Sequence, residues 1–204
     1  MILYKIVVPF VRVGIRIIGC RIDGLAHVPT EGPCIIAANH INYFDPVFLA
    51  GAIPKRMLCF IAKDSLFRKP VLGWLLGKLG AFPVSRGEGD ISAIRRCMTI
   101  LKEGKTLGIF PEGTRSATGE MNQALDGVGL IAEKSRAPIV PVRIVKVKGR
   151  KIWQRHRTRL CIGPPVLLHE LTDLPEDRRV RRKYIASLVM EKISLLGEKE
   201  FYDD

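Results

Sequence analysis

The sequence lacks the residue patterns that disulfide scaffolds and metal sites require. Its 204 residues include five cysteines, an odd number, and no two of them form a Cys-x-x-Cys pair. The four histidines are equally dispersed, with no two at the short spacing that zinc ligands use. These absences argue against a disulfide framework and against a thiolate zinc site. We therefore expect neither a metal ion nor another cofactor.

Acidic and aromatic residues are also scarce. There are 20 acidic against 33 basic residues, which gives a net charge of +13, and aromatic residues make up 7%. The basic charge predicts a polyanionic partner, and both nucleic acid and anionic lipid fit it. The aromatic residues do not cluster with lysine and arginine, as a base-stacking surface would require. Hydrophobic residues nevertheless reach 47%, which favours an ordinary globular domain over a disordered chain.

The N-terminal segment lacks an uninterrupted apolar run. Residues 1–19 are mostly apolar but include Lys5, Arg12 and Arg16, so we expect this segment not to cross a bilayer. On a helix these three cations fall within about 40° of one another, and apolar residues fill the rest of the circumference. This pattern predicts an amphipathic helix at a membrane surface, with its cations turned toward lipid phosphates. A helix that packs its apolar side on the protein's own core is the alternative. Residues 20–23 offer no small-residue cleavage site, so we do not expect a secretory signal.

Apolar runs and helical spacings alternate along the rest of the chain. The expected strands cover residues 34–38, 57–62, 81–84, 106–110, 138–145 and 160–162, and the expected helices follow residue 40 and cover residues 71–79, 90–104, 127–134 and 177–196. Pro138 and Pro141 favour a sheet edge or a bulge for their strand. The alternation predicts an α/β fold, with a central mixed sheet flanked by helices.

Polar residues follow three of the predicted strands. They occupy residues 39–46, 85–87 and 111–116. In open α/β sheets ligands bind beyond the carboxyl ends of strands. In the first segment His40 precedes Asp45 by five positions, so the carboxylate could hold one ring nitrogen while the other accepts a proton.

These segments, in this order, resemble the motif blocks of the glycerolipid acyltransferases. The matching features are Asn39 before His-x4-Asp, the Lys63 segment (60–67), Arg86 six residues after Gly80, the segment Phe-Pro-Glu-Gly-Thr-Arg-Ser at 110–116, and the strand at 139–142. The resemblance covers roughly residues 30 to 145. The sequence differs from the family at Asn42, where the family often has serine.

The resemblance implies a reaction and its partners. An acyl group is expected to pass from a thioester of acyl-carrier protein or coenzyme A to the sn-2 hydroxyl of lysophosphatidic acid, giving phosphatidic acid in phospholipid biosynthesis. His40 is expected to be the general base and Asp45 to orient it. No covalent enzyme intermediate is required.

The resemblance also implies contacts to the acceptor. The implied substrate-binding residues are Lys63, Arg86, Glu112, Gly113, Thr114 and Arg115. The two arginines have the forked donors that suit a phosphate, and Lys63 is a weaker candidate for the same group. Glu112 is expected near the glycerol of the acceptor, and Gly113 lets the backbone approach a ligand.

We therefore expect residues 1–24 to form an interfacial amphipathic helix and residues 25–204 to form the acyltransferase domain. The enzyme is expected at the cytoplasmic face of the cell membrane, peripheral or monotopic, on an anionic surface and without nucleic acid as a partner. Three alternatives stay open: a different lysolipid acceptor, a non-catalytic lipid-binding protein of the same fold, and a basic nucleic-acid-binding domain. The crowded cations between Arg143 and Arg159 favour the last, whereas the presence of His40 and Asp45 argues against the second.

Overall fold

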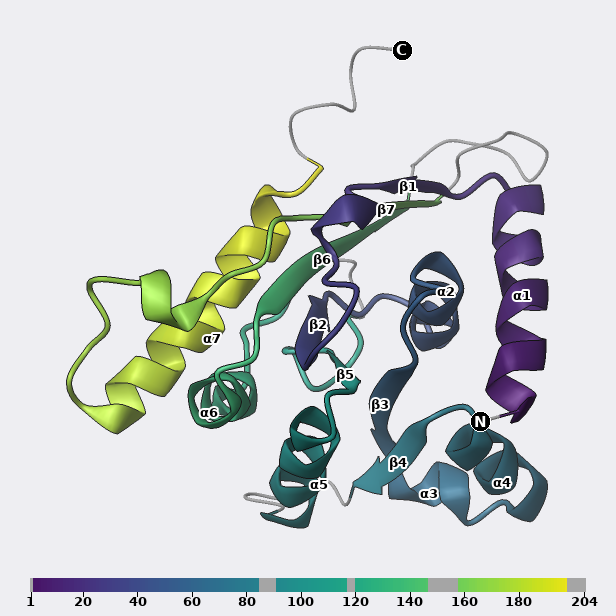
Figure 1. Ribbon diagram of the computed structural model, residues 1–204, viewed down its shortest axis with the longest axis horizontal. Coiled ribbons are helices and arrows are strands. Elements are labelled where there is room, and N and C mark those ends of the chain that lie inside the picture. The colour runs from purple at the N-terminus through teal and green to yellow at the C-terminus, as the bar shows by residue number, and fades with distance from the viewer. Residues whose placement is uncertain (1, 85–90, 117–119, 147–157, 198–204) are drawn as a thin grey trace.

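The central sheet has seven strands in the order β1-β7-β6-β2-β5-β3-β4 (Figure 1). The computed structural model describes residues 2–84, 91–116, 120–146 and 158–197. The strands are β1 (Arg21–Asp23), β2 (Cys34–Ala38), β3 (Leu58–Lys63), β4 (Ala81–Val84), β5 (Thr106–Ile109), β6 (Ile139–Lys146) and β7 (Thr158–Ile162). Neighbouring strands are parallel except β6 and β7. The predicted mixed sheet is confirmed, and each of the six predicted strands is present with its ends displaced by two residues at most.

Helices cover both faces of this sheet. They are α1 (Ile2–Ile17), α2 (Asp45–Ala52), α3 (Asp64–Phe67), α4 (Pro70–Lys78), α5 (Ile91–Lys102), α6 (Asp126–Ser135) and α7 (Arg178–Leu195), with short 3-10 turns at Leu25–His27 and Leu168–Glu170. Residues of α5, α6 and α7 share one core cluster with the sheet, and residues of α2 share a second one. Helix α1 packs on α2 (Figure 1). The predicted α/β architecture is confirmed.

Strand β2 lies at the centre of the sheet and leads to the candidate site. It pairs with β5 on one side and β6 on the other, and all five of its side chains are buried. This burial explains its continuous apolar sequence, because helices cover both faces of a parallel sheet. Strands β2, β5, β3 and β4 run in the same direction, so their carboxyl ends meet at one edge. The polar segments that follow β2 and β5 therefore emerge side by side.

Strand β6 corrects one expectation. It lies between β7 and β2, so the predicted place at a sheet edge is wrong. Val142 pairs with Ile162, and Ile139 pairs with Val166. These two pairs are three residues apart along β6 but four residues apart along the facing segment, so one extra residue in that segment interrupts the pairing. Pro141 lies at this interruption, where its carbonyl accepts the N–H of Gly163 at 2.9 Å. The alternative of a bulge accounts for a proline inside the sheet, since the missing N–H is not needed there.

The inner face of α1 packs on the protein. Tyr4, Val8 and Ile15 are buried, and the Tyr4 hydroxyl donates to the carbonyl of Arg56 at 3.2 Å. Gly51 of α2 lets the two helices approach, because a Cβ there would lie 2.6 Å from the Ile15 side chain. The alternative of core packing thus holds for one face of this helix.

The outer face of α1 is an exposed apolar stripe. Its members are Ile2, Ile6, Phe10, Val13 and Ile17, of which Ile2 is 79% and Phe10 74% exposed. At 100° per residue the stripe covers about 80° of the helix, and Lys5, Arg12 and Arg16 border it on one side. In the part of the chain that the structure describes, no helix is both long and apolar enough to cross a membrane.

Candidate active site

Asn39 ends β2 and starts the loop that carries the candidate base. Its side chain is buried, and it continues the pairing with β6. The side-chain oxygen accepts the N–H of Ile144 at 2.7 Å, and the side-chain amide donates to the carbonyl of the same residue at 3.0 Å. The amide therefore replaces a strand residue while the backbone turns away from the sheet. Sequence reasoning included Asn39 only as part of a motif, and no local signal pointed to Ile144.

His40 and Asp45 form the centre of the site. The His40 Nδ1 lies 2.8 Å from Oδ2 of Asp45, whose side chain is 2% exposed. The same carboxylate oxygen accepts the N–H groups of Ile41 and Asn42, each at 2.7 Å. Because the carboxylate can only accept, Nδ1 donates this hydrogen bond, and in the neutral ring Nε2 therefore has the lone pair. The pair has the geometry of an oriented general base.

Aromatic packing fixes the plane of the His40 ring. Phe110 stacks on it with the ring centroids 4.0 Å apart and an interplanar angle of 18°. Phe60 in turn stacks on Phe110 at 6.0 Å. Gly108 of β5 makes room for Phe60, because a Cβ at that position would lie 2.2 Å from the ring. Sequence reasoning did not assign these three residues to the site.

Glu112 joins the loops that follow β2 and β5. Its side chain is 4% exposed. One carboxylate oxygen accepts the N–H of His40 at 2.8 Å, and the other accepts the N–H and the side-chain amide of Asn122 at 2.9 and 3.0 Å. The carbonyl of His40 also accepts the N–H of Ser116 at 2.8 Å. The carboxylate thus holds the backbone of the candidate base, and its expected contact with an acceptor stays a prediction.

The next three residues turn and return toward the loop after β2. Gly113 has a φ of 66°, and its N–H donates to the carbonyl of Phe110 at 3.0 Å. A side chain there would be strained by this φ and would meet Leu125. Thr114 and Arg115 are exposed. The Arg115 guanidinium carbon lies 3.4 Å from the ring centroid of Tyr43, two residues before Asp45.

The remaining predicted contacts lie on the outer strands. Lys63 is the last residue of β3, is exposed, and pairs in register with Val84 of β4. It therefore lies at the same sheet edge as the loops after β2 and β5. Arg86 lies outside the described residues.

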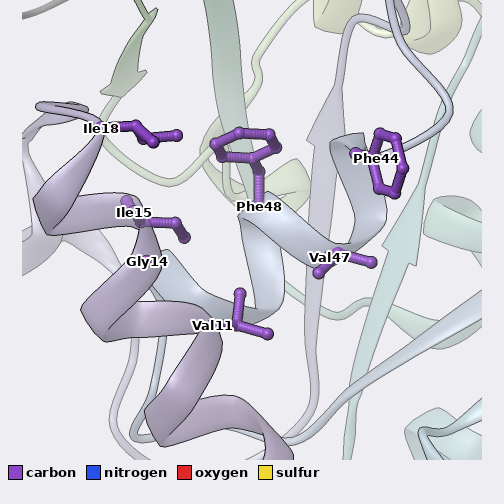
Figure 2. A pocket seen from close by; sticks show the side chains of 7 residues that line it. All are labelled: Val11, Gly14, Ile15, Ile18, Phe44, Val47 and Phe48. Carbon is purple, nitrogen blue, oxygen red and sulfur yellow. The ribbon is translucent and has the colours of Figure 1, made fainter.

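An apolar groove lies between α1 and α2 (Figure 2). Its volume is about 250 Å³, and it is lined by Val11, Gly14, Ile15, Ile18, Phe44, Val47 and Phe48. Phe44 directly precedes Asp45 in the chain.

Buried cysteines do not provide a nucleophile at this site. Burial raises the pKa of the Cys34 thiol to about 12, and it does the same for Cys97. Burial also raises the pKa of Cys20 to about 11 and raises that of Cys59. These thiols stay protonated near neutral pH, where only a thiolate is an effective nucleophile. Among the described residues, no group of three histidine, cysteine or acidic side chains is placed to hold a metal ion.

The ends of the basic run from Arg143 to Arg159 make contacts within the protein. Arg143 donates to the carbonyls of Ser194 and Leu196, the latter at 3.0 Å. Arg159 is 7% exposed and pairs with Asp23 of β1. Residues 147–157, which contain most of this run, lie outside the described part of the chain.

Comparisons with known proteins point to one group. A family model described as acyltransferase matches residues 19–145. The 1-acyl-sn-glycerol-3-phosphate acyltransferase of Bacillus subtilis is 31% identical over 163 residues, which are 79% of this chain and 81% of that protein. The chloroplastic BAT2 enzyme of the same name from Brassica napus is 32% identical, and the match covers 71% of this chain but 44% of the plant protein.

A solved structure has the same fold over nearly the whole chain. The crystal structure of the 1-acyl-sn-glycerophosphate (LPA) acyltransferase PlsC from Thermotoga maritima aligns with a TM-score of 0.69 and 25% sequence identity. The alignment covers 96% of this chain and 82% of that one.

Proposed function

This chain belongs to the acyltransferase family, and on that premise we propose that it transfers an acyl group to lysophosphatidic acid. The observation that carries the proposal is the hydrogen bond of 2.8 Å between His40 and Asp45, which leaves the Nε2 lone pair of the histidine available. The relatives in Bacillus subtilis and Thermotoga maritima bear the name of this activity. We further propose that the donor is an acyl thioester and that the sn-2 hydroxyl is the acceptor.

In the proposed reaction His40 acts as the general base. Its Nε2 takes the proton of the acceptor hydroxyl while that oxygen forms a bond to the thioester carbonyl carbon. Asp45 stabilises the imidazolium that results, because its charge lies 2.8 Å from Nδ1. When the carbon–sulfur bond breaks, the thiolate takes the proton from Nε2 and leaves as a thiol. The products are phosphatidic acid and the free thiol carrier.

Arg115 is proposed to bind the phosphate of the acceptor, with Arg86 and Lys63 as further cations. Its guanidinium offers forked donors and is held over the ring of Tyr43, beside the His40 loop. Gly113 and Thr114 precede it in the same turn and are proposed to contact the acceptor through their exposed backbone. The family resemblance implies that Glu112 contacts the glycerol of the acceptor, but its hydrogen bond to the N–H of His40 favours an action through the backbone of the base instead.

The groove between α1 and α2 is proposed to hold the alkyl chain of lysophosphatidic acid. A volume of about 250 Å³ has room for about eight methylenes, if each occupies about the 30 Å³ of a water molecule. The groove adjoins the half-buried side of α1, next to its exposed apolar stripe. A chain that leaves a bilayer along this stripe enters the groove without crossing polar surface. The groove therefore suits the membrane-borne acceptor.

Helix α1 is proposed to dock residues 25–204 on the cytoplasmic face of the cell membrane. Its exposed apolar stripe would enter the headgroup boundary, and its three cations would face anionic lipid. This peripheral attachment is proposed for α1 alone. The helix expected over residues 1–24 ends at Ile17, and residues 21–23 form β1, so the sheet begins before residue 25. The net charge of +13 supports this attachment, because it attracts both an anionic membrane surface and a phosphate-bearing lipid.

A panel assay tests the proposed function. The purified protein is given lysophosphatidic acid or another lysophospholipid, with the acyl group on coenzyme A or on acyl-carrier protein, and the lipid product is identified by mass. We expect phosphatidic acid from lysophosphatidic acid with at least one donor. Transfer to another lysolipid alone would overturn the acceptor assignment. Absence of transfer from both donors would overturn the proposed acyltransferase activity. A parallel binding assay with DNA and RNA checks the nucleic-acid alternative.

A further inference from the structure

Helix α4 is apolar on all sides, and none of its residues is buried. It has the sequence Pro-Val-Leu-Gly-Trp-Leu-Leu-Gly-Lys over residues 70–78. Val71 is 81% and Trp74 60% exposed, whereas Leu72, Leu75 and Leu76 are half-buried. A helix that is hydrophobic all round is normally covered by a protein core or by lipid. The rest of the described chain covers the leucines of this helix only in part and leaves Val71 and Trp74 exposed.

Helix α4 lies on the same side of the sheet as α1. The connections from β2 to β3 and from β3 to β4 both run outward in the strand order, so right-handed crossovers put α2 and α4 on the same face. Helix α1 packs on α2. Figure 1 shows α1, α2 and α4 toward the right of the sheet and α5, α6 and α7 toward the left. The apolar stripe of α1 and the exposed residues of α4 thus belong to one side of the molecule.

Cations border α4 at both ends. Arg68 and Lys69 precede the helix, Lys78 ends it, and all three are exposed. The side chain of Arg68 is 78% exposed even though it pairs with Asp64. An apolar middle that contains a tryptophan, with cations on either side, is typical of elements in the headgroup layer of an anionic membrane. A second copy of this chain fits less well, because two molecules with a net charge of +13 repel each other.

We propose that α4 is a second membrane-contacting element, which inserts Val71 and Trp74 into the headgroup boundary of an anionic leaflet. The nine residues extend about 14 Å, so the helix lies in the interface and does not span it. Two separate contacts, α1 and α4, prevent the protein from rotating about either helix and so fix the direction of the active-site edge. The inference rests on the proposed function only in assuming a lipid substrate, since membrane binding itself requires no turnover.

The first experiment measures the depth of Trp74. The chain has two tryptophans, so Trp153→Phe makes Trp74 the only one. Its fluorescence is recorded with vesicles of phosphatidylcholine and phosphatidylglycerol that carry bromine on the acyl chains near the headgroup. We expect a blue shift on binding and loss of more than half of the intensity relative to unbrominated vesicles. Equal intensity in both kinds of vesicle would overturn the proposal, and so would a concentration-dependent blue shift without lipid, which would indicate a second copy.

The second experiment compares matched variants on the two sides of the sheet. Val71→Asp and Trp74→Asp each place a charge on α4, and Val180→Asp does so at a position on α7 that is 53% exposed. We expect the partition coefficient into the anionic vesicles to be at least about tenfold lower for the α4 variants than for the parent. The α7 variant is expected to bind like the parent. Equal binding by all three would overturn the role of α4.

A short-chain, water-soluble lysolipid separates this inference from the proposed function. All three variants are expected to turn it over at the rate of the parent. If the parent itself shows no turnover with any lysolipid, the proposed function fails while the vesicle data still decide the role of α4.

Discussion

Arg115, which we propose binds the acceptor phosphate, has an exposed charge in a fixed position. Its guanidinium lies over the ring of Tyr43, so the cation is held at the mouth of the His40 loop although the side chain is exposed. A cation–π contact at an exposed site contributes about 0.5–1 kcal/mol, which is enough to favour one conformation over several. The residue is therefore partly preorganised for an anionic group.

Replacing Arg115 by lysine tests the phosphate assignment. An ammonium group cannot reproduce the forked donors, so Arg115→Lys is expected to raise the KM for lysophosphatidic acid by about tenfold and to leave the KM for the acyl thioester unchanged. Steady-state kinetics with each substrate varied in turn provide the measurement. Tyr43→Phe keeps the ring beneath the cation and serves as the matched control. A defect confined to the donor KM would refute the assignment.

Glu112 is the residue whose geometry departs most from its expected role. Both carboxylate oxygens accept from protein N–H groups, those of His40 and Asn122. Glu112→Gln keeps the shape but places an amide against one of these donors, and a buried donor left without a partner costs about 1–3 kcal/mol. We expect a lower Tm and a lower kcat with an unchanged KM for lysophosphatidic acid. A raised KM with an unchanged Tm would instead support direct contact with the acceptor.

Helices α1 and α2 together form the groove, which neither helix has alone. Helix α1 approaches α2 closely at Gly51, and the helices diverge near Phe44 and Phe48 (Figure 2). Gly14 lines the groove, and a Cβ there would meet no atom within 4 Å. A larger side chain at this position can therefore occupy the groove without displacing the helices.

Filling the groove with Gly14→Leu is expected to reduce chain-length preference. Each fully buried methylene contributes about fourfold in affinity, so a leucine that displaces about two methylenes should lower the ratio of kcat/KM for sixteen-carbon over four-carbon acceptors by on the order of tenfold. Gly127→Leu in α6, where a Cβ also meets nothing within 4 Å, is the matched control because both changes raise helix propensity. An unchanged ratio, or a change in donor chain-length preference alone, would contradict the proposed occupant.

The elements that the sequence predicts well are those with a continuous apolar pattern. β2 and β4 have the expected bounds because Pro33 and Gly80 precede their apolar runs and a polar residue follows each run. β1 (Arg21–Asp23) and α3 (Asp64–Phe67) were not predicted, since three or four residues with charged side chains show no period. For β6 the sequence left a sheet edge and a bulge open, because the effect of Pro141 depends on where the neighbouring β7 stops pairing, which the local sequence does not contain.

At the scale of the whole molecule, sheet order determines which motif residues meet. His40 and Glu112 are 72 positions apart, and Asn39 and Ile144 are 105 apart. They meet because β5 and β6 flank β2, an order that no single motif encodes. The pairing of His40 with Asp45 could be predicted from the sequence because both belong to one turn. The partners of Glu112 could not.

Each of the two cores also contains a buried thiol, and this makes stability depend on alkaline pH. Cys34 belongs to the core on the α2 side and Cys97 to the core on the opposite side. Burial raises both pKa values from 9.0 to about 12. Below pH 9 the thiols are neutral in the folded and in the unfolded protein. Above pH 9 they ionise in the unfolded protein, so unfolding releases their protons. Their contribution to stability is therefore lost between about pH 9 and 12, by about 1.4 kcal/mol per pH unit for each thiol.

The double variant Cys34→Ala/Cys97→Ala tests this dependence. We expect it to be less stable than the parent at pH 8 but to lose less free energy of unfolding as the pH rises to 10.5. Urea unfolding curves at several pH values provide the measurement, and lysine and tyrosine titrations are common to both proteins. Parallel curves would show that the buried thiols do not cause the loss.

We propose that His40, held by Asp45, is the general base for acyl transfer to lysophosphatidic acid. The most direct test measures phosphatidic acid formation and thiol release by the parent, His40→Ala and Asp45→Asn, after thermal unfolding has shown that all three are folded. We expect product from the parent, a rate at least about 100-fold lower for His40→Ala, and a smaller but large loss of rate for Asp45→Asn. A folded His40→Ala protein that forms phosphatidic acid at a rate close to that of the parent would contradict the proposal.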